Sequence, residues 1–232
     1  MVSSDNNNTI ITYAVLAGLT PLIPIPFIDD VALRYFKRHL VRQLSSSHGT
    51  SLSDEQIRAL IDDASSGGYV SGVAGAVIKY PLKKVFRKVF YFLEWKRAAD
   101  TASRTYYQGF LIDHALAKGW CEPIGTRSVL QVRSSIDRVL ASTDTRPIEF
   151  AVASTFRGFK GLIGDAAALI GRQISATIGK GGDKKAELAV AEAEQRGEQQ
   201  LGGVIDQLRT AIAAMPTQHF TTLREGLAKE LA

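Results

Sequence analysis

The sequence predicts an all-α protein, an irregular multi-helix bundle with a proline-rich N-terminal elbow and amphipathic helices. Apolar residues recur at helical spacing along most of the chain, which is the main sequence signal of an amphipathic helix. Runs of alternating β-branched residues between tight turns, which are typical of strands, are missing from the sequence. The chain has 232 residues, 45 % of them hydrophobic, and is therefore long enough to bury a substantial core.

The first predicted elements are two helices that meet at the elbow. Residues 6–28 carry no charged side chain, and the run is broken near its end by three prolines: Pro21, Pro24 and Pro26. An uncharged run of about 20 residues is long enough to cross a bilayer. Because proline removes a backbone donor and clashes with the preceding turn, one straight helix is not expected. We predict helices near residues 9–19 and 29–44, the second capped by Asp29 or Asp30, with apolar faces either in a protein core or against lipid.

A short helix and a stretch of small residues come next. The helix is predicted from Ser53 to about Asp63, because the acidic residues in its first turn are favourable there. Residues 64–78 carry no charge, and Gly68 and Gly72 have the small-xxx-small spacing that permits close helix packing. A tightly packed helix or a flexible loop of a soluble protein is the alternative. The uncharged run is too short to predict a membrane span.

The stretch from Pro81 to Arg97 carries the clearest functional signal. Pro81 suits the first turn of a helix, after which apolar side chains recur on one face and cations on the other. Between Lys79 and Arg97 there are seven basic residues and one acidic residue. Such a helix suits the surface of an anionic bilayer. The residues predicted to bind the membrane are Lys83, Lys84, Phe86, Arg87, Lys88, Phe90 and Trp95.

Two other interpretations of these charges were weighed. A helix that faces a protein core and has a solvated basic back shows the same pattern. Nucleic acid also attracts clustered cations, and the net charge of +5 favours polyanions in general. No recognisable DNA- or RNA-binding motif accompanies the charges, so anionic lipids are the predicted partner and nucleic acid is not.

The remainder of the chain predicts further helices and one linker. The helix that begins at Pro81 is expected to continue to Lys118, and Gly119 and Pro123 mark a break after it. Additional helices are predicted at residues 126–141, 148–178, 184–200, 204–214 and 217–231. The Gly-Lys-Gly-Gly-Asp run at 179–183 is the best linker. It divides the chain into a main, membrane-proximal domain (1–178) and a C-terminal helical arm (183–232), which is expected to contact a protein partner or a second copy.

Signals of catalysis or metal binding are weak. Three pairs of adjacent residues could in principle serve such roles: the acidic pairs Asp29-Asp30 and Asp62-Asp63, and the pair Asp113-His114. No Glu-x-x-His or His-x-x-x-His pair supports them, and capping or surface solvation explains such residues. The single cysteine, Cys121, excludes a disulfide within the chain. Neither a phosphate-binding loop nor a Gly-x-Ser-x-Gly nucleophile motif is present. No catalytic residue, metal ligand or cofactor is predicted, and the protein is not expected to be an enzyme.

Residues 19–30, Leu-Thr-Pro-Leu-Ile-Pro-Ile-Pro-Phe-Ile-Asp-Asp, followed by a basic helix, carry a family resemblance. This segment resembles parts of the EcsC-like proteins and of the small hydrophobic domain attached to some membrane-associated GTPases of bacteria. The resemblance implies an all-α, membrane-proximal bacterial protein without established catalytic residues. Because no GTPase motif occurs in this chain, GTPase activity does not carry over.

These observations together predict a membrane-associated helical scaffold, remodelling factor or accessory protein. The N-terminus lacks the positive flank of a secretory signal, so we expect a location on the cytoplasmic side, peripheral to or partly inserted in the inner face of the cell membrane. Two alternatives remain open. One is a soluble helical module that binds a partner or ligand. The other is an uncharacterised enzyme that uses Asp29, Asp30 or His114.

Overall fold

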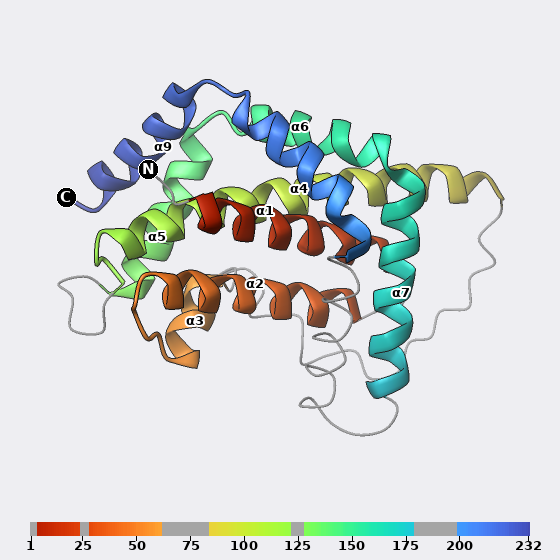
Figure 1. Ribbon diagram of the computed structural model, residues 1–232, viewed down its shortest axis with the longest axis horizontal. Coiled ribbons are helices and arrows are strands. Elements are labelled where there is room, and N and C mark those ends of the chain that lie inside the picture. The colour runs from red at the N-terminus through yellow and green to blue at the C-terminus, as the bar shows by residue number, and fades with distance from the viewer. Residues whose placement is uncertain (1–3, 24–27, 62–83, 122–127, 179–198) are drawn as a thin grey trace.

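The protein is seen here as a computed structural model that describes five segments of the chain (Figure 1): residues 4–23, 28–61, 84–121, 128–178 and 199–232. Every regular element in these segments is a helix, and none of the described residues lies in a strand. The predicted all-α fold class is confirmed. The helices are α1 (Ser4–Leu19), η1 (Thr20–Leu22), α2 (Ile28–Ser47), α3 (Asp54–Ile61), α4 (Lys84–Ala117), α5 (Val129–Ser142), α6 (Arg146–Gly158), α7 (Lys160–Ile178), a helix at 199–213, and α9 (Thr217–Glu230).

The apolar N-terminal helix α1 lies in the centre of the fold, between α4 and α2 (Figure 1). Residues 10–20 are all buried except Thr12, which is partly exposed. A helix that is apolar on every side is stable in water only when protein covers all of it. Residues 10–20 of the uncharged run therefore supply core, and this part of α1 turns its side chains towards other helices of the same chain.

Glycine permits the close contact between α1 and α4. A Cβ atom on Gly18 would lie 2.7 Å from the Cβ of Ala102, 2.9 Å from the Cζ of Phe156 and 3.0 Å from the carbonyl oxygen of Ala98. Two of these three neighbours are fixed to the α4 backbone and cannot rotate away. The two helices can therefore approach this closely only because position 18 has no side chain.

The chain leaves α1 by a short 3₁₀ turn that contains Pro21 in its first positions. Helix α2 then begins at Ile28, with Asp29 and Asp30 inside its first turn, where negative charge interacts favourably with the helix dipole. No single helix joins α1 to α2. Pro24 and Pro26 lie outside the described residues, so the elbow built on all three prolines stays a prediction, as do the packing roles of Gly68 and Gly72.

Two predicted helix boundaries were wrong. Residues 148–178 were expected as one helix, but α6 ends at Gly158 and α7 begins at Lys160. Phe159, between them, has φ −117° and ψ 28° and packs against the core, so the chain changes direction there (Figure 1). A break was also expected between residues 200 and 204, yet residues 199–213 form one helix. The burial of its apolar face outweighs the low helix propensity of Gly202 and Gly203.

The C-terminal helices share the core of the main body. Leu201, Val204 and Leu208 of the helix at 199–213 are fully buried, as are Leu223 and Leu227 of α9. Helix α9 packs on α5 and α4. The linker predicted at 179–183 lies outside the described residues, so the division of the chain at that point stays a prediction.

A buried arginine holds α5 against α3. Arg133 is only 6 % exposed, and its Nη1 atom donates a 2.7 Å hydrogen bond to the backbone oxygen of Leu60, near the end of α3. The last carbonyl groups of a helix have no partner within the helix, so this bond satisfies one of them. The Nε atom of Arg133 donates to Asp137 at 2.9 Å, which fixes that carboxylate on α5.

We expect Gly18→Ala to destabilise the fold. Overpacking of a core typically costs about 1–3 kcal/mol, which exceeds the gain of roughly 1 kcal/mol that alanine brings to a helix interior. Gly164→Ala in α7 is the matched control, because among the described residues no atom beyond its chain neighbours and the adjacent helix backbone lies within 4 Å of its added Cβ. That variant should be stabilised by about 0.5–1 kcal/mol. Urea unfolding of both variants measures the difference, and an equal effect at the two positions would contradict the close α1–α4 contact.

Candidate functional site

In the described part of the chain, a hollow lies where α4, α5 and α6 meet. Its volume is about 390 Å³, within the range of small-molecule pockets. It is lined by Asp100, Ser103, Arg104, Tyr107, Asp137, Leu140, Ala141, Thr145 and Glu149. We refer to it as the α4–α6 hollow.

Helical periodicity explains how the lining is assembled. The four residues from α4 are spaced i, i+3, i+4 and i+7, so they form one face of that helix. The three residues from α5 are spaced i, i+3 and i+4, and Thr145 and Glu149 are four residues apart at the start of α6. Sequence reasoning missed this site because periodicity reveals each face but does not indicate that the three faces converge.

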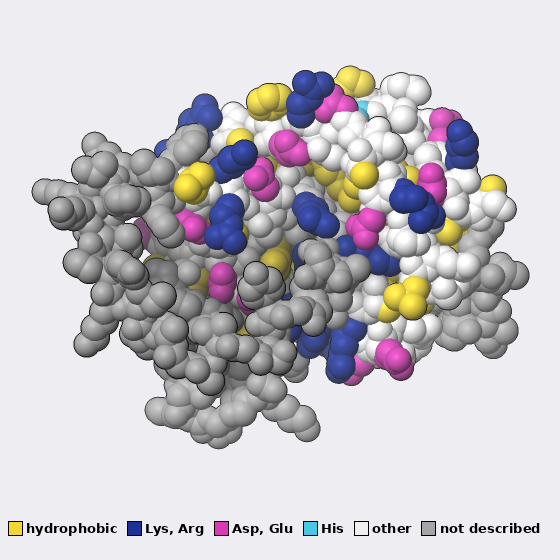
Figure 2. Space-filling model, turned by 180° about the vertical axis from the view of Figure 1, so that it is seen from behind, with side chains coloured by type: hydrophobic (Ala, Val, Ile, Leu, Met, Phe, Trp, Pro, Cys, Tyr) yellow, Lys and Arg dark blue, Asp and Glu magenta, His cyan; other side chains and the backbone are white. Residues whose placement is uncertain are grey.

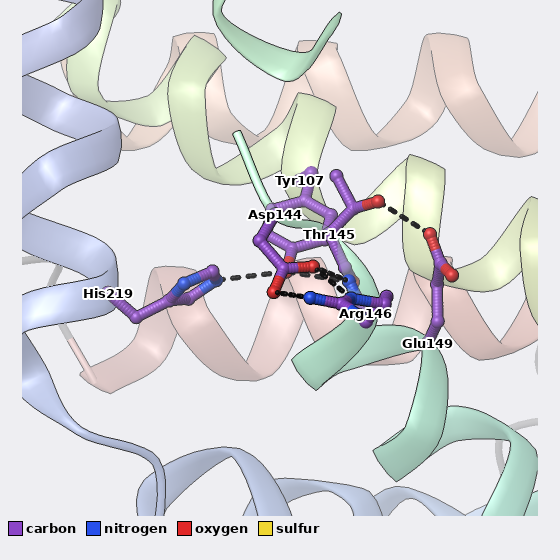
Figure 3. A network of polar contacts seen from close by, with 6 residues as sticks. All are labelled: Tyr107, Asp144, Thr145, Arg146, Glu149 and His219. Carbon is purple, nitrogen blue, oxygen red and sulfur yellow. Dashed lines mark hydrogen bonds and ion pairs between the residues drawn. The ribbon is translucent and has the colours of Figure 1, made fainter. Parts of the chain in front are cut away.

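Tyr107 lines the hollow and is buried, and Figure 3 shows its polar contacts. Its hydroxyl donates to the backbone oxygen of Thr145 at 3.2 Å and lies 2.9 Å from Nε2 of His219 on α9. The hydroxyl has one proton and gives it to the carbonyl, so Nε2 of His219 must carry the hydrogen of the second bond. Burial raises the pKa of Tyr107 well above its usual value and lowers that of His219. Both groups are therefore neutral at neutral pH.

The turn before α6 is held by two further pairs (Figure 3). The Thr145 hydroxyl donates to Glu149 at 2.6 Å. Arg146 donates from Nε and Nη2 to the two oxygens of Asp144, each at 2.8 Å. The hydrogen bond from Arg146 lowers the pKa of Asp144 to about 2. These contacts orient the first turn of α6 and so place Glu149 at the hollow.

The lining carries more negative than positive charge. Asp100, Asp137 and Glu149 supply three carboxylates, and Arg104 supplies one guanidinium. Burial raises the pKa of Asp100, the nearby cation of Lys96 acts in the opposite direction, and the charge of Glu149 adds a smaller increase. The Asp100 carboxylate is thus less well solvated than a carboxylate in open water.

A second polar cluster joins the start of α1 to α4 and to the turn after α2. Asp113 of α4 is 2 % exposed. Its Oδ1 accepts from Nδ2 of Asn6 at 2.6 Å and from Nε2 of His48 at 2.8 Å. Gly49, directly after His48, has φ +68°, a conformation that glycine adopts without strain. This geometry satisfies a buried carboxylate, and no nucleophilic side chain takes part in the cluster.

The adjacent residues Asp113 and His114 point in different directions, as their spacing predicts. The imidazole of His114 lies edge-on to Trp120, with ring centroids 5.6 Å apart. Burial, followed by the charges of Arg224 and Lys118, lowers the pKa of His114. The two residues therefore do not form a catalytic pair. Asp113 pairs instead with His48, which lies 65 positions away in the sequence.

The other residues considered for catalysis or metal binding lie in surroundings that do not favour either role. Cys121 is fully buried, and burial raises the pKa of its thiol to about 12, so it is not a reactive thiolate. Asp29 is partly exposed and Asp30 is exposed, while Asp62 and Asp63 lie outside the described residues. Within the described segments, no three His, Cys, Asp or Glu side chains converge in a way that could hold a metal ion.

The predicted membrane-binding residues are only partly described. Lys83 lies outside the described residues. The backbone from Lys84 to Phe90 belongs to the start of α4, as predicted, but the positions of those side chains are not described. Trp95 is partly buried, packs on the core and has the Nζ atom of Lys160 5.7 Å from its ring centre. None of the described helices is both long enough and apolar enough to cross a bilayer.

Comparison with known proteins identifies no relative of this chain. No protein-family model, no curated protein and no solved structure matches the chain.

We expect Asp113→Ala to be strongly destabilising. The change leaves the donors of Asn6 and His48 without their acceptor, and an unsatisfied buried polar group costs about 1–3 kcal/mol. The matched control is Asp30→Ala at an exposed position in the first turn of α2, where the lost dipole interaction costs under about 1 kcal/mol. Thermal or urea unfolding followed by circular dichroism measures both. Equal costs at the two positions would show that the Asp113 cluster is not buried as described.

The two histidines with lowered pKa values make stability depend on pH. His114 and His219 bind protons more weakly in the folded chain than in the unfolded chain, where the pKa is about 6.5. The unfolded state therefore takes up more protons below that pH, and the free energy of unfolding should fall as the pH drops from 7 to 5. The variant His114→Gln/His219→Gln should lose less stability over the same interval. A pH dependence identical to that of the unmodified protein would contradict the burial of both rings.

Proposed function

We propose that the protein is a non-catalytic helical scaffold, remodelling factor or accessory subunit that attaches peripherally to an anionic membrane surface on the cytoplasmic side. The basic segment at the start of α4 makes the attachment. The single observation that carries this proposal is the concentration of seven cations and one acid between Lys79 and Arg97. Each cation near an anionic surface contributes about 1 kcal/mol of binding free energy.

The position of this segment supports a surface role. In Figure 1 the first turns of α4 extend past α7, at one end of the molecule. Beyond them Leu93 is 48 % exposed, and Lys96 and Arg97 are also exposed. A helix that presents both apolar and cationic side chains to solvent is suited to the boundary between head groups and acyl chains.

Over much of the face seen in Figure 2, Lys and Arg side chains of the described segments lie near Asp and Glu side chains. Several charges of the described segments form ion pairs, such as Arg146 with Asp144 and Arg138 with Glu230. Mixed charges of this kind attract an anionic surface weakly, because neighbouring opposite charges cancel at a distance.

The fold changes the expected role of the N-terminal apolar run. Because α1 is enclosed by protein, attachment in this proposal does not depend on inserting α1 into lipid. Trp95 packs on the core beside Lys160, so it fixes the basic segment to the body and leaves the residues before it to meet the surface.

The proposal is tested by flotation on liposomes that contain anionic phospholipid. The variant Lys84→Gln/Arg87→Gln/Lys88→Gln should bind up to about two powers of ten more weakly, at roughly 1 kcal/mol per cation. Binding of the unmodified protein should also weaken as salt rises. Arg58→Gln/Lys118→Gln/Lys229→Gln changes the net charge equally at exposed positions elsewhere and should bind normally.

Two outcomes would contradict the proposal. One is that the unmodified protein fails to float with anionic liposomes. The other is equal loss of binding in both triple variants, which would mean that net charge matters and the α4 segment does not. The first result would favour the second candidate function, a soluble helical module that binds a ligand, because the α4–α6 hollow offers a site for one.

A further inference from the structure

We propose that the α4–α6 hollow binds a small organic cation, an aliphatic amine or guanidine, whose charged group lies between Asp100 and Glu149. This inference concerns a different part of the molecule from the basic segment and does not rest on membrane attachment. The shape of the hollow suits a small ligand, and the acidic residues that line it favour a ligand that is a cation.

The hollow reaches the buried layer of the protein. Ser103 and Tyr107, which line it, are 2 % and 1 % exposed. Leu140 and Ala141 of α5 form an apolar wall, against which a short aliphatic chain can pack. A ligand in the hollow would thus be partly removed from water, which strengthens any charge interaction it makes.

The acidic side chains at the hollow are not equivalent. Asp137 is neutralised by Arg133 at 2.9 Å, and Glu149 accepts a hydrogen bond from Thr145 but has no cation bonded to it within the described segments. The Asp100 carboxylate forms no hydrogen bond or ion pair with the described residues. A ligand cation beside Asp100 and Glu149 would offset both the partial desolvation of Asp100 and the repulsion between the two acids.

A metal ion fits this arrangement poorly. Ca²⁺ takes six to eight oxygen ligands close together, and Mg²⁺ needs a near-ideal octahedron. The acids at the hollow come from three helices, and within the described segments no three such side chains form a group that could hold a metal ion. A hollow of about 390 Å³ also leaves a bare ion in contact with little of its wall. An elongated organic cation matches both the separated acids and the apolar side.

The test is isothermal titration calorimetry of the full chain with agmatine and with putrescine. Saturable binding at one site per chain is expected, and the neutral analogue 1,4-butanediol should not bind. Asp100→Asn/Glu149→Gln should weaken the binding of agmatine at least tenfold. Asp165→Asn/Glu55→Gln removes the same charge at exposed positions on other helices and should leave binding unchanged.

Asp100→Asn alone guards against a folding defect, because Asp100 is exposed and its carboxylate lacks a bonded partner among the described residues. With an unchanged circular dichroism spectrum, this variant should still bind agmatine at least threefold more weakly. The inference is overturned if neither amine binds saturably, if the diol binds as well as the amines, or if the hollow variants and the control bind equally. Binding of Mg²⁺ that is lost in the same hollow variants, without binding of the amines, would also overturn it.

Discussion

The close contact between α1 and α4 is the constraint on which the rest of the structure depends. At Gly18 the α1 backbone lies directly against Ala98 and Ala102 of α4, and a single added carbon has no room. Near the other end of the pair, an added Cβ on Gly109 of α4 would meet Ile10 at 3.1 Å. The two helices thus run antiparallel in intimate contact, and α2 covers another side of α1. Packing this tight gives the apolar part of α1, from Ile10 onward, a place inside a water-exposed protein.

Because α4 is fixed against α1, its other faces are available for different tasks. One face carries Asp113, whose carboxylate accepts hydrogen bonds from Asn6 at the start of α1 and from His48 after the end of α2. Another meets α9, where Arg224 lies over Phe110 and His219 bonds to Tyr107. A third faces α5 and α6 and forms the floor of the hollow. The first turns of α4 extend past α7 (Figure 1) and belong to the basic segment. One helix of 34 residues therefore links the core, both polar clusters and both proposed binding surfaces.

The polar groups buried beside α4 also explain how a largely apolar core specifies one arrangement. Two of them have partners only in one register: Tyr106 donates to Asn7 at 3.1 Å, and Asp113 accepts from two chain segments at once. A shift of α1 by one turn would keep many apolar contacts but leave these groups unsatisfied. The free-energy cost of unsatisfied buried polar groups is steep enough to exclude such alternatives.

The sequence by itself determined the fold class and most helices, because apolar periodicity, Gly119 and Pro216 act within one or two turns of chain. It also indicated that Asp113 and His114, as neighbours on a helix, point in different directions. Only the tertiary structure decided that the apolar run lies in protein and that His48 is the partner of Asp113. The same holds for the break at Phe159 and for the convergence of three helix faces at the hollow. These features join residues up to 112 positions apart, as Tyr107 and His219 are, and local patterns carry no information about which helix faces meet.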